Sequence, residues 1–168
     1  MSSPQTESFR QSMRRMAATV CIVTCEHEGE RYGITVTSVT PLSFDPLSVL
    51  VCLNNGASVS DPLLKKTYYC INILQNSQAL ISKRFSGGVA PAERFLAGDW
   101  SVGIAQTPYL ADAQANLFCQ IDQTLAYATH QIVIGRVLEA RFSEAVAPLV
   151  YQNGQYAACA PLQLSGAA

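Results

Sequence analysis

Apolar and polar residues alternate with a period of two along several short segments of this chain, and that spacing predicts β-strands. In residues 33–38, Ile34 and Val36 share one face of an extended strand, whereas Thr35 and Thr37 share the other. Because side chains on opposite faces of a strand meet different surroundings, one face suits a core and the other suits a flat polar ligand.

The same pattern, together with the turn residues, predicts a mainly β chain with a few short helices. Strands are expected at residues 19–24, 31–39, 48–53, 68–74, 117–126 and 131–142, and a hairpin with a type I′ turn at Asn153-Gly154 joins residues 150–151 to 156–157. Helices are expected at about residues 5–16, at 60–66 and from Ser77 to Gly87-Gly88, with a helical turn at 91–95. Pro41 and Asp45-Pro46 should interrupt the chain between two strands, and residues 89–108 should be rich in loops. Strands mostly follow strands, which favours an antiparallel barrel over a doubly wound sheet.

A second segment, residues 50–58, runs from an apolar strand into a turn of small polar residues. The strand holds Cys52 and Leu53, and the turn begins at Asn54 and ends at Ser58. Small residues at such a turn let backbone N–H groups approach a ligand closely. Taken with the hydroxyl-rich strand at residues 33–38, this segment predicts a cradle for a flavin.

Composition indicates one domain, residues 1–168, with a core at about residues 9–157 and a tail at 158–168. Apolar residues make up 49% of the chain and charged residues only 14%, so part of the surface is expected to be covered by a second subunit. The net charge is −1 and cations do not cluster, so we expect no nucleic-acid partner. The first 16 residues are polar and no apolar run reaches membrane-spanning length, so we expect a cytoplasmic protein without a membrane contact.

The inventory of catalytic groups is small. The six cysteines form no C-x-x-C pair and no histidine is spaced to complete a zinc site, so we expect no metal and read the cysteines as buried residues in a reducing compartment. His27 and His130 are the only histidines, and no nucleophile elbow, phosphate loop or dinucleotide fingerprint occurs. Hydride transfer between a nicotinamide and a flavin needs few protein groups, because the cofactors make and break the bonds.

Six short motifs, in this order, resemble those of the short-chain flavin reductases, in particular the 4-hydroxyphenylacetate 3-monooxygenase reductases and the pyrimidine-utilisation flavin reductases. The resemblance runs from about Phe9 to Tyr156, and the motifs are Phe9-Arg10-Gln11-Ser12-Met13, Gly33-Ile34-Thr35-Val36-Thr37-Ser38, Leu50-Val51-Cys52-Leu53-Asn54, Cys70-Ile71-Asn72-Ile73-Leu74, Arg84-Phe85 and Thr129-His130.

The resemblance implies a homodimeric, FMN-binding split β-barrel of the antiparallel, Greek-key type. Such a protein uses NADH or NADPH to reduce FMN or FAD and supplies the reduced flavin to a separate monooxygenase. By resemblance, His130 faces the nicotinamide. The residues implied in flavin binding are Thr35, Val36, Thr37 and Ser38 beside the ring and ribityl chain, Cys52, Leu53, Asn54 and Ser58 in the second part of the cradle, and Ser82, Lys83, Arg84 and Phe85 on the helix near the phosphate.

Other interpretations remain open from the residues alone. Thr35 and Thr37 could simply favour a strand, His130 could be structural, and Lys83 and Arg84 could form a solvated helix face. A non-catalytic flavin carrier or sensor would share the barrel. So would an oxidase of the pyridoxamine-phosphate type, which usually carries more basic residues.

Overall fold

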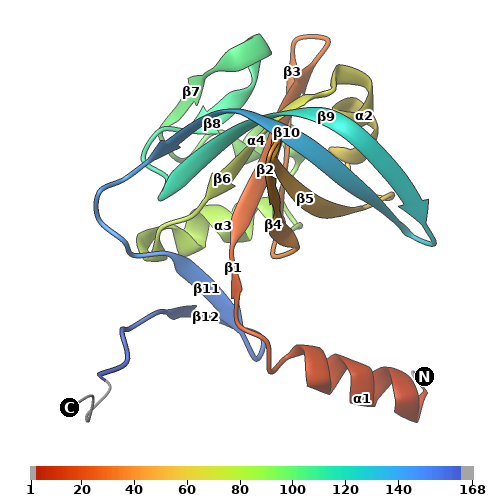
Figure 1. The fold of residues 1–168 in the computed structure, drawn as a ribbon, viewed down its shortest axis with the longest axis vertical. Coiled ribbons are helices and arrows are strands. Elements are labelled where there is room, and N and C mark those ends of the chain that lie inside the picture. The colour runs from red at the N-terminus through yellow and green to blue at the C-terminus, as the bar shows by residue number, and fades with distance from the viewer. Residues whose placement is uncertain (1–2, 164–168) are drawn as a thin grey trace.

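The computed structural model describes residues 3–163, and antiparallel strands dominate it (Figure 1). Seven strands form one sheet in the order β3-β2-β6-β9-β10-β5-β4. Their bounds are β2 Cys21–His27, β3 Glu30–Val36, β4 Val39–Phe44, β5 Leu47–Asn54, β6 Tyr68–Ile73, β9 Ala115–Tyr127 and β10 His130–Phe142. All neighbouring strands in this sheet are antiparallel. The prediction of a mainly β, antiparallel chain is therefore confirmed.

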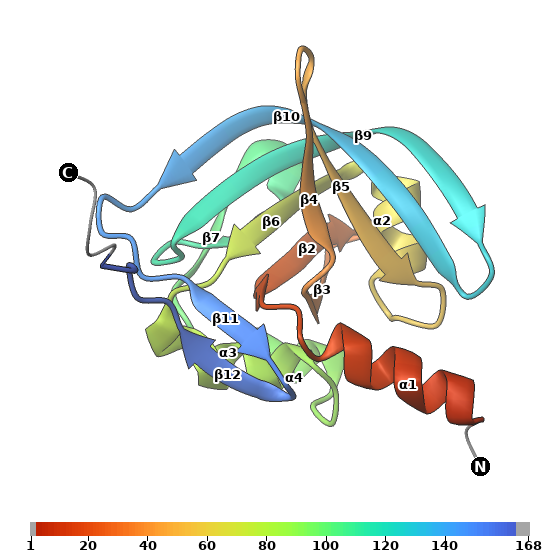
Figure 2. The ribbon, with the colours of Figure 1, turned by 60° about the horizontal axis from the view of Figure 1, so that its bottom comes forward.

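The sheet curls on itself. Its two edges, β3 and β4, are separated in the chain only by Thr37 and Ser38, so the edges approach each other at this link (Figure 2). The Ser38 hydroxyl donates a hydrogen bond of 2.8 Å to the Cys52 carbonyl in β5, which fastens the link to the sheet. The first and second predicted ligand-binding segments thus lie next to each other.

Smaller elements flank this sheet. A three-stranded sheet is formed by β1 (Ala18–Thr19), β11 (Leu149–Gln152) and β12 (Gln155–Ala158), and a two-stranded one by β7 (Trp100–Val102) and β8 (Pro108–Leu110). The helices are α1 (Pro4–Met13), α2 (Ser60–Lys66), α3 (Ala79–Phe85) and α4 (Pro91–Arg94), and the 3₁₀ turns are η1 (Asn76–Gln78) and η2 (Ile104–Gln106). None of the described helices is both long and apolar enough to cross a bilayer.

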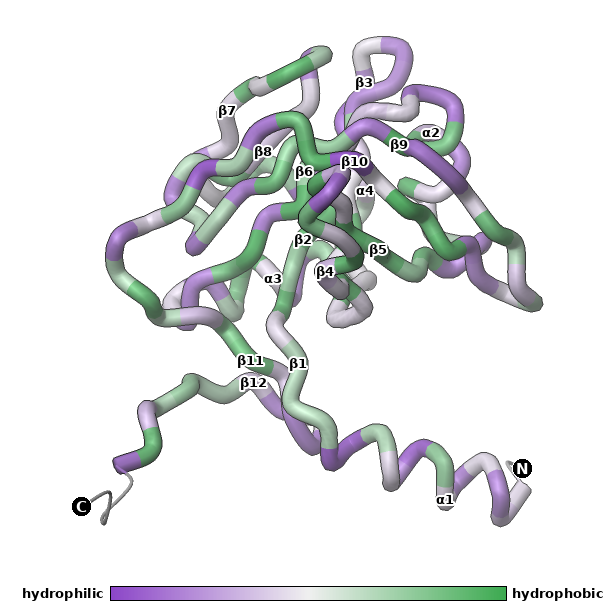
Figure 3. The backbone as a smooth tube through the Cα atoms, in the orientation of Figure 1, coloured by the Kyte–Doolittle hydropathy of each residue, from purple (hydrophilic) through white to green (hydrophobic). Residues whose placement is uncertain are grey.

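Two apolar clusters form the core. The first lies inside the curled sheet and includes Val23, Val51 and Ile71, each fully buried. The second joins α3 to the other side of β2 through Ile22 and Phe85. Hydrophobic residues gather in the central strands, whereas α1 alternates between hydrophobic and hydrophilic residues and projects from the rest (Figure 3). No residue of α1 is buried.

Several predicted boundaries are wrong. The predicted strand 31–39 is two strands, because β3 ends at Val36 and β4 starts at Val39. Pro41 does not interrupt the chain but lies within β4, where the register shifts between Pro41 and Ser43. Since β4 is an edge strand, a residue without an N–H group costs it no ladder hydrogen bond. The first helix ends at Met13 rather than near residue 16.

Later elements also differ in detail. The predicted helix from Ser77 is the 3₁₀ turn η1 followed by α3, in which Phe85 is buried and Leu80 is 79% exposed. The loop-rich segment contains β7 and β8. The hairpin at Asn153-Gly154 is confirmed, because both residues have positive φ (51° and 82°), as a type I′ turn requires.

Candidate functional site

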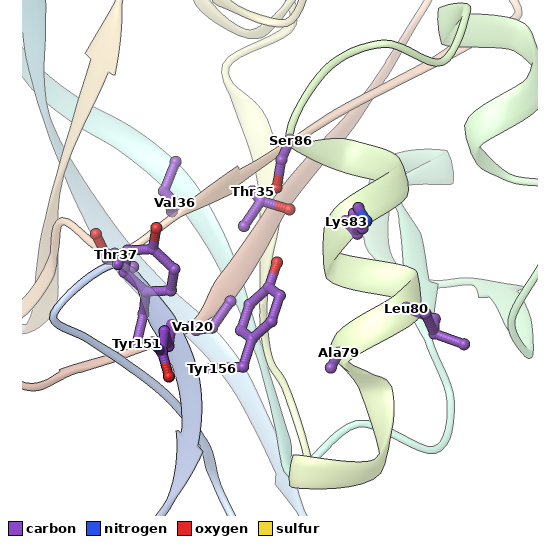
Figure 4. A pocket seen from close by; sticks show the side chains of 12 residues that line it. Val20, Thr35, Val36, Thr37, Ala79, Leu80, Lys83, Ser86, Tyr151 and Tyr156 are labelled. Carbon is purple, nitrogen blue, oxygen red and sulfur yellow. The ribbon is translucent and has the colours of Figure 1, made fainter.

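A cavity of about 580 Å³ opens between the end of β3, helix α3 and the β11–β12 hairpin (Figure 4). Its volume lies within the range of about 300–1,000 Å³ that is usual for small-molecule sites. We call it the β3–α3 cavity. Its walls are formed by Val20, Thr35, Val36, Thr37, Ala79, Leu80, Lys83, Ser86, Tyr151, Gly154, Gln155 and Tyr156.

The β3 wall carries the hydroxyl residues predicted from the alternating pattern. Ile34 packs against the inner core and Thr35 lines the cavity, as the two-faced strand predicts, but Val36 does both, and Thr37 lines the cavity just after β3 ends. The Thr35 hydroxyl donates a hydrogen bond of 2.7 Å to the Ser82 carbonyl in α3. The strand end and the helix are therefore held together at the cavity.

The four predicted residues of α3 lie in different places. Lys83 lines the cavity and is exposed. Arg84 lies outside this cavity, and its Nη2 donates to the Glu93 carbonyl at 2.7 Å. Ser82 is fully buried. Of the two adjacent cations, only Lys83 is placed to meet a ligand in this cavity.

Phe85 is buried beneath β3. Its ring lies edge to face with Phe95, at 5.0 Å between centroids, and 5.2 Å from Trp100. An added Cβ on Gly33 would lie 2.7 Å from Phe85 Cε1, so the ring fills the space that the glycine leaves. The structure thus places Phe85 in the packing that supports the cavity rather than in its lining.

The second predicted segment is adjacent to the β3–α3 cavity but does not line it. Leu53 is in the core at 1% exposure, and Asn54 Oδ1 accepts a hydrogen bond of 2.8 Å from the Gly56 N–H group. Arg94 connects this segment to β3, because its Nη1 lies 2.8 Å from the Gly33 carbonyl and 3.4 Å from Ser58 Oγ.

His130 lies beside the Asn54 turn. It is the first residue of β10 rather than part of the preceding connection, and its register partner in β5 is Asn54. Its Nδ1 is 2.9 Å from Thr129 Oγ1, and the Asn55 N–H group donates to the Thr129 carbonyl at 2.9 Å. The histidine is exposed and does not line the β3–α3 cavity.

Sequence reasoning missed the wall contributed by the C-terminal hairpin. Tyr151 and Tyr156 line the cavity, and the Tyr156 hydroxyl is 2.9 Å from Ser82 Oγ. The sequence predicted the hairpin from Asn153-Gly154. Nothing local indicated that this hairpin packs near Thr35, because the contact spans most of the chain.

The buried thiols are not suited to act as nucleophiles. Burial raises the pKa of Cys21, Cys25 and Cys119 to about 12, so each is protonated near neutral pH. Within residues 3–163, no group of three or more His, Cys, Asp or Glu side chains could hold a metal ion. The cavity offers instead hydroxyls, aromatic rings and one ammonium group, which suits binding a polar aromatic anion.

Comparisons with known proteins agree on one family. Residues 13–160 match the family described as flavin reductase like domain. The chain is 40% identical over 161 residues, 95% of this chain and 90% of the relative, to the reductase component of the FADH₂-dependent resorcinol hydroxylase of Rhizobium sp. strain MTP-10005. It is 34% identical over 149 residues, 89% of this chain and 84% of the relative, to the FMN reductase (NADH) RutF of Pseudomonas syringae pv. syringae strain B728a.

The fold is also similar to that of a solved flavin reductase domain protein. The crystal structure of a flavin reductase domain protein from Arthrobacter sp. FB24 superposes with a TM-score of 0.88, at 28% identity, and covers 95% of this chain and 99% of that one.

Proposed function

The chain belongs to the flavin reductase like domain family, and we propose that it is an NAD(P)H:flavin oxidoreductase that reduces FMN or FAD by hydride transfer and supplies reduced flavin to a separate monooxygenase. The observation that carries the proposal is the β3–α3 cavity, where the hydroxyl residues of β3 and the Lys83 ammonium face one space. These groups match a flavin, which joins a flat polar ring to a phosphate.

Within this cavity the residues have separate tasks. Lys83 holds the phosphate, because an ammonium group forms strong charge-assisted hydrogen bonds with phosphate oxygens. Thr35, Val36 and Thr37 fix the ring and ribityl chain through backbone and hydroxyl groups, and Ser38, which lies next to the lining, holds this segment against β5 through its bond to Cys52. The flavin supplies the electron chemistry, and the protein binds and orients it.

The His130 side of the site is assigned to the nicotinamide. His130, Asn54 and the following turn lie side by side, and Ser38 connects this region to the flavin-binding strand through its bond to Cys52. Replacing His130 with Asn should raise the KM for the nicotinamide more than the KM for flavin. His27→Asn is the matched control, since His27 lies in β2 at the opposite end of its strand from the cavity. An unchanged nicotinamide KM in His130→Asn would remove His130 from the site.

We propose that the curled sheet is the split β-barrel of Greek-key type that the family resemblance implies. The two-residue link between its edge strands, which the Ser38 hydrogen bond fastens to β5, supports this.

We further propose a homodimer. Helix α1 and the residues that follow it present Phe9, Met13 and Met16 at 64%, 45% and 61% exposure. These side chains line an open groove beside the β11–β12 hairpin, and such an exposed apolar surface is suited to contact with a second copy. Phe9→Glu should shift the sedimentation coefficient toward that of a monomer, and an unchanged value would place the interface elsewhere.

Partner and location follow from the same reading. The relative in the resorcinol hydroxylase system is a reductase component, and by analogy this chain would serve a separate flavin-dependent oxygenase. A reducing cytoplasm suits its six free cysteines.

The decisive experiment follows NADH and NADPH oxidation by the purified protein with and without free FMN or FAD. We expect oxidation that depends on added flavin, with one electron pair transferred to each flavin. Flavin binding without oxidation of either nicotinamide would instead identify a carrier or sensor.

A further inference from the structure

Ser82 connects the three walls of the β3–α3 cavity. It is fully buried, and its carbonyl accepts hydrogen bonds from Thr35 Oγ1 at 2.7 Å and from Ser86 Oγ at 2.9 Å. Its own hydroxyl pairs with the Tyr156 hydroxyl at 2.9 Å. One residue of α3 thus fixes both the hydroxyl-bearing strand and the C-terminal hairpin.

The hairpin presents two aromatic rings to the cavity. Tyr151 and Tyr156 face each other across β11 and β12, with ring centroids 5.6 Å apart and an interplanar angle of 69°. They remain 40% and 37% exposed although they line the cavity. In Figure 4 the Tyr156 ring stands between the Thr35 side and the Ala79 side of the space. Exposed aromatic faces beside a cavity are suited to stacking against a flat aromatic ligand.

We propose that Tyr156 is a flavin-positioning residue, which rests on the proposed function. Its ring stacks against the flavin, and its hydroxyl, held by Ser82, fixes that ring relative to the Thr35 strand. The hydrogen bond matters because a stacking wall orients a ligand only if the wall itself has one position. Tyr156 takes no part in bond making and acts through placement.

The test compares three single variants and one double variant with the wild type by titrating FMN and FAD. Stacking on tyrosine quenches flavin fluorescence by electron transfer from its phenol ring, so we expect wild-type protein to quench bound flavin and both Tyr156→Phe and Tyr156→Leu to leave it more fluorescent. Loss of the ring in Tyr156→Leu should weaken flavin binding about tenfold, which corresponds to the upper end of the stabilisation expected from an aromatic pair. Tyr156→Phe and Ser82→Ala should each weaken flavin binding about threefold, because each removes the same hydrogen bond. The double variant that combines these two substitutions should bind flavin no more weakly than either single variant.

Phe142→Leu is the aromatic control, since Phe142 is 75% exposed and lies outside the cavity lining. It should leave quenching and affinity unchanged. Thermal unfolding of each variant separates a lost contact from a lost fold, and tighter flavin binding by Tyr156→Phe than by Tyr156→Leu distinguishes stacking from general hairpin damage. If Tyr156→Leu folds, binds flavin as tightly as the wild type and quenches it equally, the inference is wrong while the reductase proposal stands. If the wild-type protein binds no flavin, both fail.

Discussion

Replacing Gly33 with Ala tests how β3 and α3 are held together. An added Cβ would lie 2.7 Å from Cε1 and 2.9 Å from Cδ1 of Phe85, closer than carbon atoms tolerate. Phe85 cannot move cheaply, because it is 1% exposed and packs against Phe95 and Trp100. Overpacking of this kind costs about 1–3 kcal/mol, and we expect about 2 kcal/mol.

The displacement should also reach the cavity. If the added methyl pushes Phe85 and α3 away from β3, the 2.7 Å hydrogen bond from Thr35 to the Ser82 carbonyl lengthens. Flavin binding should therefore weaken together with stability. Flavin titration of folded Gly33→Ala measures this second effect separately from the first.

The stability of each variant can be measured by urea unfolding, with tryptophan fluorescence as the signal, since Trp100 is the only tryptophan and packs against Phe85. Adding Phe85→Leu to Gly33→Ala should recover part of the loss, because a smaller side chain leaves room for the methyl group. Gly56→Ala is the control: its added Cβ meets only the Asn54 side-chain oxygen at 3.3 Å, so its effect should stay within about 1 kcal/mol. A Gly33→Ala protein as stable as the wild type would refute the packing argument.

Three further predictions follow from named contacts. Lys83→Ala should weaken flavin binding several-fold while Arg84→Ala does not, because of the two only Lys83 lines the β3–α3 cavity. Equal losses of flavin affinity in the two variants, measured by flavin titration, would contradict this. Asn72→Ala should lower the free energy of unfolding by about 3–5 kcal/mol, because the fully buried Asn72 side chain forms hydrogen bonds with four residues, namely Ile22, Thr24, Leu110 and Asn116. The Lys66 ammonium, 2.7 Å from the Glu26 carboxylate, lowers the pKa of Glu26. The stability that this pair contributes is therefore present above the ordinary carboxyl pKa and is lost as the pH falls through the lowered pKa of Glu26. Lys66→Met should make the free energy of unfolding depend less steeply on pH in acid.

The first two of these predictions have matched controls. Lys65→Ala removes a lysine that pairs with Asp61 on the exposed side of α2, and it should leave flavin affinity unchanged. Asn76→Ala truncates an exposed asparagine near Asn72 in the chain and should change stability by less than about 0.5 kcal/mol. A loss in Asn76→Ala as large as that in Asn72→Ala would show that the buried network is not its cause.

The fold was predictable where the signal is local. Period-two alternation identified most strands, and Asn153-Gly154 identified the hairpin because a type I′ turn needs positive φ at both residues. Strand β4 was missed because Pro41 normally excludes a strand interior. Whether a strand lies at an edge depends on the order of the whole sheet, and no local window contains that order.

The candidate site was predictable in part. The alternating pattern singled out Thr35 and Thr37, which line the cavity, but it did not indicate that Val36 between them lines it as well. The two adjacent cations of α3 are divided by the β3–α3 cavity, which Lys83 lines and Arg84 does not. Both also line a second pocket beside Gly87 and Gly88, so their order in the sequence could not show which of them faces the β3–α3 cavity.

The C-terminal wall of the cavity depends on contacts that a single sequence does not reveal. Thr35, Ser82 and Tyr156 meet although 47 residues separate the first two and 74 the last two. Such contacts form only after long loops have closed, so the complete cavity exists only in the fully folded chain. A ligand that touches all three walls binds that state and not partly folded ones, and its binding free energy therefore adds to the stability of the hairpin docking. A substitution that breaks one of these hydrogen bonds should therefore weaken both the docking of the hairpin and the binding of flavin.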